Sequence, residues 1–516
     1  MSNKPLILDC TLRDGGYYTN WDFDQELVKD YFIAMEKLPV EYLEIGYRSK
    51  PMKGYLGEFF YCPKYIFEKA RRLAPSKKIA IILNEKDCQP TDVDYLFDGL
   101  NEYIDLVRIA VNPDRFDYAI ELAKSIKSAG FSVAFNVMYM SKWIKDKVFL
   151  EKIHKVNGLV DFFYMVDSFG SVYPDQVKEL VNILKQKIDV PLGFHGHNNL
   201  ELAHINTLTA IEEGCEIVDA TITGMGRGAG NLKTELLLTS MASNYSLEIS
   251  FNELSVIVSD FEKMQKQYGW GTNLPYMFSG SNSLPQKEVM EWMGLNRYPL
   301  GSMLTALKNQ RDEISDNIEL PKFRVEKKFE KVVIVGGGVS VNNQLEIIKR
   351  FLKILGDVCI IHAGVRYSKL LSDLKVLEQY YCLVGSEALK LKREFNDLTS
   401  LNGKCIFPPF PRQMGTVLPN EIKEVSYELE DLSFTNKFED SPLAIALQLG
   451  LNLSNKEIIL VGFDGYESSK DKVQFQLANE NQYLIDRMLA NNVEISSATK
   501  TNYKNIAEKS LFSYFK

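Results

Sequence analysis

Short apolar runs rich in β-branched and aromatic residues recur through the first 240 or so residues, and helical stretches separate them. The runs begin 25 to 36 residues apart, and amphipathic segments such as DQVKELVNILKQKI lie between them. Eight alternating βα units of this even spacing favour a closed (β/α)₈ TIM barrel over an open doubly wound sheet. The eight runs are LILDC (6–10), YLEIGY (42–47), KIAIIL (78–83), DLVRIAV (105–111), SVAFNVMY (132–139), DFFYMV (161–166), PLGFH (191–195) and EIVDATI (216–222).

After the eighth run the pattern turns mostly helical and polar, and a strand signal returns at KVVIVGGG (331–338). A helical segment, the run VCIIHAG and the later run EIILVGFDGY (457–466) follow, as in a doubly wound α/β domain. A chain of 516 residues is too long for one core. We therefore expect a TIM-barrel catalytic domain over 1–245, a helical extension and linker over 246–327, and a Rossmann-like domain over 328–516.

Composition narrows the possible partners. The chain is 45% hydrophobic and 25% charged, with a formal net charge of −8, which argues against nucleic acid as a partner. The first apolar run is too short for a signal peptide, and no stretch approaches the roughly 18 apolar residues of a membrane helix. The seven cysteines include no CxxC pair, as expected for reduced thiols. We expect a cytoplasmic protein without membrane contact that forms a homo-oligomer.

Polar residues at the ends of the predicted strands form a candidate metal site. Asp14 follows the first run, and His195 and His197 end the seventh, two positions apart and on the same side of an extended chain. Asn231, in the loop after the eighth run, could add a fourth oxygen ligand. In a barrel these strand ends meet at one face. One carboxylate and two imidazoles suit Mn²⁺, Mg²⁺, Co²⁺, Fe²⁺ or Zn²⁺, although two such histidines can also be ordinary hydrogen-bonded residues.

Arg13 stands beside the candidate ligand Asp14. A 2-oxo acid loses its α-proton readily only if the enolate oxygen is stabilised, and a fixed guanidinium can do this. Arg13 could instead pair with Asp9 or Glu44 inside the barrel. Both roles can hold, because a catalytic arginine needs partners that position it.

Three motifs resemble those of the DRE-TIM metallolyase superfamily, over roughly residues 4–300. They are LDCTLRDGG (8–16), HGHNN (195–199) and GMGRGAGN (224–231). That superfamily includes 3-hydroxy-3-methylglutaryl-CoA lyase, isopropylmalate synthase and 4-hydroxy-2-oxovalerate aldolase. The resemblance implies a divalent metal, foremost Mn²⁺ or Mg²⁺ with Zn²⁺ or Co²⁺ as further options, held by Asp14, His195 and His197. It places Asn231 on or close to the metal and assigns Arg13 to the enolate.

The same resemblance points to four further positions. Glu44 and Arg108, on the second and fourth predicted strands, match polar barrel positions of the superfamily; the alternative is an interior salt bridge. Asp167 and Ser168, in MVDSFGSVYP, match an element near the bound oxo acid; the alternative is a cap for the next helix.

Details after the RDG motif favour one branch of the superfamily. RDGGYYTNW and YMFSGSNSLP (276–285) resemble the pyruvate aldolases of the 4-hydroxy-2-oxovalerate type more than the acetyl-CoA condensing synthases. Two departures stand out. Tyr17 and Tyr18 occupy the place of a histidine of those aldolases, and Leu284-Pro285 replaces a histidine-proline pair. Tyr17 is therefore our candidate for proton transfer.

The C-terminal region carries a second candidate site. The glycines of GGGVS (336–340) could let a backbone approach a phosphate, or simply form a tight βα turn. The segment is not GxGxxG, which argues against a nicotinamide cofactor. The order of GGGVS, IIHAG, DSPLAIALQLG and EIILVGFDGY loosely resembles the pterin-pyrophosphokinase-like and motility-accessory families of surface glycan modification. The candidate residues for a nucleotide or sugar ligand are Gly336, Gly338, Ser340, Ser441 and Asp464.

The preferred hypothesis is a metal-dependent aldolase that joins or separates a pyruvate-type enolate and an aldehyde. The aldehyde could be sugar-derived and serve surface polysaccharide biosynthesis. One alternative is an acyl-CoA Claisen-type condensing enzyme or lyase of the same superfamily. Another is a non-catalytic barrel with a ligand-binding C-terminal domain.

Overall fold

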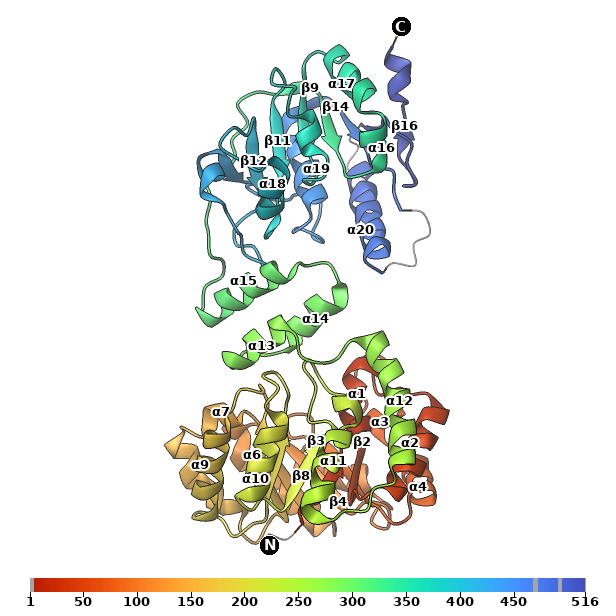
Figure 1. The fold of residues 1–516 in the computed structure, drawn as a ribbon, viewed down its shortest axis with the longest axis vertical. Coiled ribbons are helices and arrows are strands. Elements are labelled where there is room, and N and C mark those ends of the chain that lie inside the picture. The colour runs from red at the N-terminus through yellow and green to blue at the C-terminus, as the bar shows by residue number, and fades with distance from the viewer. Residues whose placement is uncertain (1–3, 467–471, 491–493, 516) are drawn as a thin grey trace. The chain divides into compact units, whose positions relative to one another are not determined.

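The computed structural model describes residues 4–466, 472–490 and 494–515 (Figure 1). The chain divides into two compact units, Met1–Met290 and Glu291–Lys516, and each has its own hydrophobic core. The three-part division after residues 245 and 327 stays a prediction. No helix among the described residues has both the length and the apolar character needed to cross a membrane.

The first unit contains a closed barrel of eight parallel strands in chain order, which confirms the (β/α)₈ fold. Every strand predicted from the hydrophobic pattern is present, with ends that shift by a few residues. The strands are β1 (Leu6–Asp9), β2 (Tyr42–Tyr47), β3 (Lys78–Asn84), β4 (Leu106–Val111), β5 (Val133–Val137), β6 (Phe162–Asp167), β7 (Leu192–Gly196) and β8 (Ile217–Ala220).

Helices cover the outside of this barrel (Figure 1). In one of them, Asp24 caps the first turn by accepting from the backbone N–H groups of residues 26 and 27, and the residues buried on its inner face recur every three or four positions. The helices of the unit up to this point are α2 (Gln25–Lys37), α3 (Glu58–Tyr61), α4 (Lys64–Leu73), α5 (Val93–Phe97), α6 (Phe116–Ser128), α7 (Met140–Trp143), α8 (Lys147–Lys152), α9 (Pro174–Lys185), α10 (Ala203–Glu212) and α11 (Thr234–Tyr245), together with α1 (Thr11–Thr19), which lies at the mouth of the barrel directly after β1.

The barrel interior changes character along its axis. Side chains alternate between the inside and the outside of each strand, so positions two apart face the same way. An apolar cluster fills the interior, with members that include Leu8, Tyr42, Leu106, Ala134 and Ile217. Two residues further along their strands, towards the carboxyl ends, the inward positions become polar. They are Glu44, Arg108, Asn136 and Asp219.

Helices α12 (Phe251–Tyr268) and α13 (Leu274–Ser281) extend the barrel unit. Leu254, Ile257 and Phe261 of α12 join the barrel's outer core. Asn199, in the loop after β7, donates to the Tyr276 carbonyl at 2.9 Å and ties α13 to the mouth of the barrel. Helix α14 (Lys287–Leu295) follows.

The second unit is built on an eight-stranded parallel sheet in the order β13-β12-β11-β10-β9-β14-β15-β16. Its first strand lies in the middle, and the chain adds strands to one side and then to the other, as in a doubly wound fold. The strands are β9 (Phe329–Val335), β10 (Val358–His362), β11 (Gln379–Cys382), β12 (Lys404–Phe407), β13 (Ser426–Glu428), β14 (Ser454–Val461), β15 (Ile495–Ser497) and β16 (Ala507–Glu508).

The sequence pattern named only β9, β10 and β14 of this sheet. The other five strands have two to four residues each, too few for a period to stand out. The predicted helix after β9 is present but broken at Gln344. The helices of the unit are α15 (Leu300–Arg311), α16 (Val339–Asn343), α17 (Leu345–Ile354), α18 (Glu387–Phe395), α19 (Pro442–Leu453) and α20 (Lys472–Leu489).

The segment between α15 and β9 is built into the second unit. Asp316 forms a buried ion pair with Arg412 at 2.7 Å, and the backbone N–H of Leu320 donates to Glu428 at 3.1 Å. Part of the stretch expected to be a linker therefore contributes contacts to this unit.

Candidate active site

The mouth of the barrel brings Asp14, His195 and His197 together. Asp14 lies in α1 directly after β1, and the two histidines lie at the end of β7, with ring centroids 5.0 Å apart. His197 Nδ1 lies 2.8 Å from the Asp167 carbonyl oxygen. Because a carbonyl can only accept, Nδ1 carries the proton and Nε2 keeps its lone pair for a metal. His195 Nε2 lies 3.7 Å from Asp14 Oδ2.

Asn231 joins this group from the loop after β8. Its Nδ2 donates to Asp14 Oδ2 at 2.6 Å, and the residue forms a β-bridge with His197. Its Oδ1 is buried and has no hydrogen-bond partner within the described residues. A buried, unpaired carbonyl oxygen beside a carboxylate fits a cation ligand, because such an oxygen otherwise loses its hydration without compensation.

Arg13 is held on two sides. It donates through Nη1 to Asp14 and through Nε to Glu44. Glu44, which is fully buried, also accepts from Arg108 Nη1 at 2.9 Å. The predicted pairing of Arg13 with Glu44 is thus present, whereas Asp9 accepts from other groups.

These contacts close into a loop around the barrel interior. Arg108 donates through Nη2 to Asp219, and Asp219 Oδ2 lies 2.8 Å from His195 Nδ1. The other nitrogen of His195 faces Asp14, where the loop begins. We call this set the charge ring, and its members are Asp14, Arg13, Glu44, Arg108, Asp219 and His195.

A histidine binds a metal through its neutral imidazole, and with His195 in that form the charge ring has three carboxylates against two guanidiniums and holds one negative charge in excess. Burial raises the pKa of Asp14, but the positive charge of Arg13 is the strongest influence against burial, and the pKa lies below its usual range. The same balance between burial and Arg108 lowers the pKa of Asp219. Excess negative charge in a buried site favours a bound cation. Burial lowers the pKa of His197 to about 3, which keeps its imidazole neutral.

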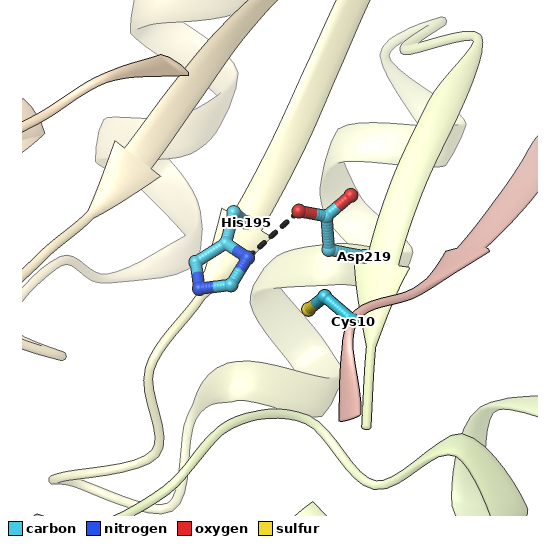
Figure 2. A group of neighbouring side chains, drawn as sticks. All are labelled: Cys10, His195 and Asp219. Carbon is cyan, nitrogen blue, oxygen red and sulfur yellow. Dashed lines mark hydrogen bonds and ion pairs between the residues drawn. The ribbon is translucent and has the colours of Figure 1, made fainter. Parts of the chain in front are cut away.

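Figure 2 shows a second set of potential ligands, Cys10, His195 and Asp219. Asp219 already accepts from Arg108 and His195, so a metal there would lie against a guanidinium. Burial raises the pKa of the Cys10 thiol well above its usual value, so it stays protonated. Cys10 and Asp219 also lie behind His195, outside the lining of the cavity. The set with Asp14 and His197 fits a catalytic metal better, because substrate can reach it.

A cavity of about 270 Å³ opens above these residues. Arg13, Asp14, His195 and His197 form its floor. Its remaining lining is Tyr17, Tyr47, Ile82, Asn84, Glu85, Lys86, Ala110, Asn112, Arg115, Asn136, Met138, Tyr139, Val166, Ser168 and Arg227.

Of the other residues predicted from the sequence, some line the cavity and some lie outside it. Tyr17 lines the cavity, with its hydroxyl 3.1 Å from that of Tyr47. Ser168 also lines it and accepts from the Tyr139 backbone N–H at 2.9 Å. Arg108 lies below the cavity, where its guanidinium stacks on a tyrosine ring and donates to Asn136 Oδ1.

The Asp167 carboxylate also lies outside the cavity lining. It accepts from the backbone N–H groups of Ser171 and Val172 and so shapes the loop that follows β6. Burial raises the pKa of this carboxyl to about 6.

Sequence reasoning missed Asp219 and Asn136. Both lie at inward positions of strands that are otherwise apolar, two residues after members of the apolar interior cluster. Side chains alternate between the inside and the outside of each strand, and a polar residue at a position that faces the inside is unusual. This alternation could have identified both residues. It also missed the cavity residues Lys86, Arg115 and Arg227, which lie in loops where no periodicity applies.

The second unit has a cavity of its own, of about 570 Å³. Gly336, Gly338, Ser441 and Asp464 line it. Ser340 donates to the Asp464 carboxylate through both its backbone N–H and its hydroxyl. A Cβ on Gly338 would lie 2.5 Å from Asp464 Cγ, so glycine is required for this close approach. The Asp464 carboxylate therefore occupies donors that a phosphate would use.

Several known proteins are similar to about half of this chain. A 4-hydroxy-2-oxovalerate aldolase from Pectobacterium atrosepticum is 32% identical over 241 residues, which make up 46% of this chain and 69% of that protein. An oxaloacetate decarboxylase from Mycobacterium tuberculosis is 28% identical over 239 residues, 46% of this chain and 70% of that one. A family model described as HMGL-like matches residues 107–258.

A solved structure is also similar to the barrel part of this chain. The crystal structure of the N-terminal domain of a candidate aldolase from Bacteroides vulgatus is 51% identical to this chain, with a TM-score of 0.56. It covers 58% of this chain and 99% of that domain. With the eight-stranded barrel in place, the chain belongs to the HMGL-like family, the DRE-TIM group of metal-dependent carbon–carbon lyases.

Proposed function

We propose that the protein is a divalent-metal-dependent aldolase that forms or cleaves the bond between a pyruvate-type enolate and an aldehyde. One observation carries this proposal: a single cavity presents Arg13, Asp14, His195 and His197. The charge ring holds the first three side chains, and the Asp167 carbonyl holds His197. The aldolase and decarboxylase relatives support the same reaction class.

Asp14, His195 and His197 would hold the cation, with Asn231 Oδ1 as a further ligand. When bound, a divalent cation supplies Lewis-acid polarisation of the 2-oxo acid. The protein orients the ligands in advance. Hydrogen bonds on both Nδ1 atoms fix the rings, and the Asn231 amide orients the Asp14 carboxylate.

Arg13 would stabilise the negative charge on the enolate oxygen. Its Nε and Nη1 are engaged by Glu44 and Asp14, and no hydrogen bond from the described residues engages Nη2. The guanidinium is therefore fixed in orientation and keeps a donor for the cavity. A donor that is already in place costs no reorganisation when charge develops. Glu44 and Arg108 act as positioning residues through this contact.

Tyr17 is our candidate for proton transfer. In the synthetic direction pyruvate C3 loses a proton as the enolate forms, C3 attacks the aldehyde carbon to form one C–C bond, and the new alkoxide oxygen takes up a proton, so the proton count is unchanged. Burial raises the pKa of Tyr47 well above its usual value, so Tyr47 stays protonated and can donate to Tyr17. Tyr17 can then direct its own proton to the alkoxide, and cleavage reverses these steps.

Exchange of the pyruvate methyl protons in D₂O, followed by NMR, tests the proposal. We expect exchange that needs Mn²⁺ or Mg²⁺, stops with a chelator and requires no acyl-CoA. Exchange of the acetyl-CoA methyl protons, with those of pyruvate left in place, would favour the Claisen-type alternative. No exchange by the metal-loaded protein would favour a non-catalytic barrel.

We further propose that the second unit binds a nucleotide or sugar ligand, as part of a role in surface polysaccharide synthesis. Its cavity lies at the carboxyl ends of β9, β10 and β14, beside the point where the strand order reverses, and ligands of open α/β sheets bind at such points. Arg366 and Lys390 line this cavity and could contact a phosphate. Calorimetric titration of the full chain with nucleoside phosphates and neutral sugars tests the idea. Arg366→Ala should weaken binding of the phosphate-bearing ligands by removing a cation from the lining, and no binding of either class would refute the idea.

A further inference from the structure

The wall of the barrel cavity carries more positive than negative charge. Beyond the floor pair Arg13 and Asp14, the charged lining residues are the cations Lys86, Arg115 and Arg227 and one carboxylate, Glu85. They come from the loops after β3, β4 and β8. The wall therefore has an excess of two positive charges, above a floor whose own charges are paired within the ring.

Two of these cations have no acidic partner. Arg115 pairs with Glu85 at 3.4 Å and stacks on a tyrosine ring, so its charge already has partners within the protein. Lys86 and Arg227, by contrast, form no ion pair within residues 4–466, 472–490 and 494–515. Lys86 is exposed, and an exposed lysine is ordinary. The informative residue is Arg227, which is half-buried at the cavity.

The backbone holds Arg227 in place. The Tyr18 hydroxyl donates to the Gly228 carbonyl at 3.3 Å, and the Gly230 N–H donates to the Arg227 carbonyl at 3.2 Å. The guanidinium lies 5.2 Å from the centre of the Tyr17 ring. This ring contact alone leaves an unneutralised charge beside a candidate metal site, where a further positive charge is unfavourable. A substrate anion would remove that cost.

The rest of the wall is suited to hydroxyl groups. The amides of Asn84, Asn112 and Asn136 line the cavity together with the Tyr139 side chain. A short alkyl aldehyde would leave these polar groups without partners, and a site of this kind discriminates against such a ligand.

On the basis of the aldolase function proposed above, we infer that the acceptor is a hydroxylated aldehyde with a phosphate or carboxylate group. The anionic group lies at the end remote from the carbonyl, where Arg227 binds it, and Lys86 adds to the positive potential of the wall. It takes no part in the reaction: the aldehyde carbon forms the new bond to pyruvate C3, and the anion only anchors the substrate.

Three aldehydes of equal carbon number test this inference on the full-length, Mn²⁺-loaded protein. They are glyceraldehyde, glyceraldehyde 3-phosphate and tartronate semialdehyde, which are neutral, phosphate-bearing and carboxylate-bearing. We expect kcat/KM with pyruvate to be at least about tenfold higher for one of the anionic aldehydes than for glyceraldehyde. Whichever anion is preferred identifies the source of the charge.

Arg227→Gln should remove this preference, mainly through KM for the anionic aldehyde, by about ten- to a hundredfold. Lys86→Gln should have a smaller effect in the same direction. Arg72→Gln, an exposed change in the last turn of α4, is the matched control and should alter nothing. Calorimetric binding of glycerol 3-phosphate, glycerate and glycerol repeats the comparison without turnover.

The two proposals fail in different ways. No pyruvate deuterium exchange by the wild-type protein contradicts the aldolase function, and the binding series still tests the anion site. Exchange with equal kcat/KM for all three aldehydes contradicts the anionic acceptor. A rise in KM for pyruvate itself in Arg227→Gln, measured by exchange without an aldehyde, would mean that Arg227 binds the pyruvate carboxylate, and it would also overturn the inference.

Discussion

The two cavities of this chain both lie at the carboxyl ends of parallel strands, yet they hold their polar groups in different ways. In the barrel, the charge ring links groups from β2, β4, β7 and β8 and from α1, and each member contacts two others. In the second unit, the Asp464 carboxylate fixes the glycine loop through a single residue, Ser340, among the described residues.

The difference follows from the closure of the sheet. A closed barrel brings the inward side chains of strands far apart in sequence within ion-pair distance, so that charges can support one another around a circle. An open sheet has two edges and offers a cavity only at its switch point. The barrel is thus suited to a fixed electrostatic field, and the second unit to reversible binding.

The largest effect is expected from His195→Ala, which removes a ligand and opens the charge ring. The purified variant should contain no metal by elemental analysis and show no pyruvate exchange, while its circular dichroism stays that of the wild type. His154→Ala changes an exposed histidine and serves as the control. Full metal content in His195→Ala would rule out this ligand assignment.

Arg13→Lys tests whether the ring serves the enolate. Lysine keeps the charge but cannot donate to Glu44 and Asp14 in the same fixed plane. We expect kcat for exchange to fall about 10²- to 10³-fold, the range for loss of one oxyanion donor, with metal content unchanged. Normal turnover in this variant would make Arg13 a structural residue.

A third contrast concerns a buried histidine of the second unit. His362 stacks on Tyr381 and lies 2.9 Å from Gln379, and burial lowers its pKa to about 4. In the unfolded chain His362 takes up a proton below about pH 6.5, whereas in the folded chain it stays neutral down to about pH 4. The free energy of unfolding therefore falls by about 3 kcal/mol as the pH drops from about 6.5 to 4.

Calorimetric unfolding between pH 7 and pH 4 measures this loss. His362→Gln should flatten the pH dependence of the transition of the second unit, whereas His154→Gln should leave it as in the wild type. An equally steep dependence in His362→Gln would assign the acid sensitivity to other groups.

Asp219→Asn neutralises the ring without removing a ligand. The amide can still contact His195, but the excess negative charge is gone, and we expect metal affinity to fall about 10- to 100-fold with kcat at saturating metal less affected. Cys10→Ala is the control. If Cys10, His195 and Asp219 formed the true metal site, Cys10→Ala would weaken metal binding as well.

The smallest effect is expected from removal of the second unit. The cut belongs after Asn296 rather than near Asp316, because Asp316 pairs with Arg412 in the second unit. The relative from Bacteroides vulgatus was crystallised as its N-terminal domain alone, which supports independent folding. Pyruvate exchange should stay within about threefold of the full chain. A folded, metal-loaded barrel without exchange would show that the second unit completes the site.

Much of the barrel could be predicted from the sequence because its strands are long enough to show an apolar pattern. Asp14, His195 and His197 could be singled out because they lie at the ends of such strands or directly after them. Asp219 escaped notice, since a single carboxylate within a strand gains its meaning only from Arg108 and His195, which come from other strands.

The second unit was harder to predict for two physical reasons. Strands such as β13 and β15 have three residues each, and tertiary packing rather than local pattern defines them. The role of Asp464 depends on a contact with Ser340, which lies 124 positions earlier in the chain. The glycine motif that looked suited to phosphate is thus already bound to a carboxylate from a distant part of the sequence.

The excess negative charge of the ring also affects the amount of folded protein that a cell maintains. Without a cation, the barrel must fold around a buried charge that its arginines do not neutralise. An ion that binds only the native state adds about 2.7 kcal/mol of stability at a concentration of 100 times Kd. When metal is scarce, more molecules would unfold and be degraded, so the metal supply would set the abundance of the enzyme as well as its rate.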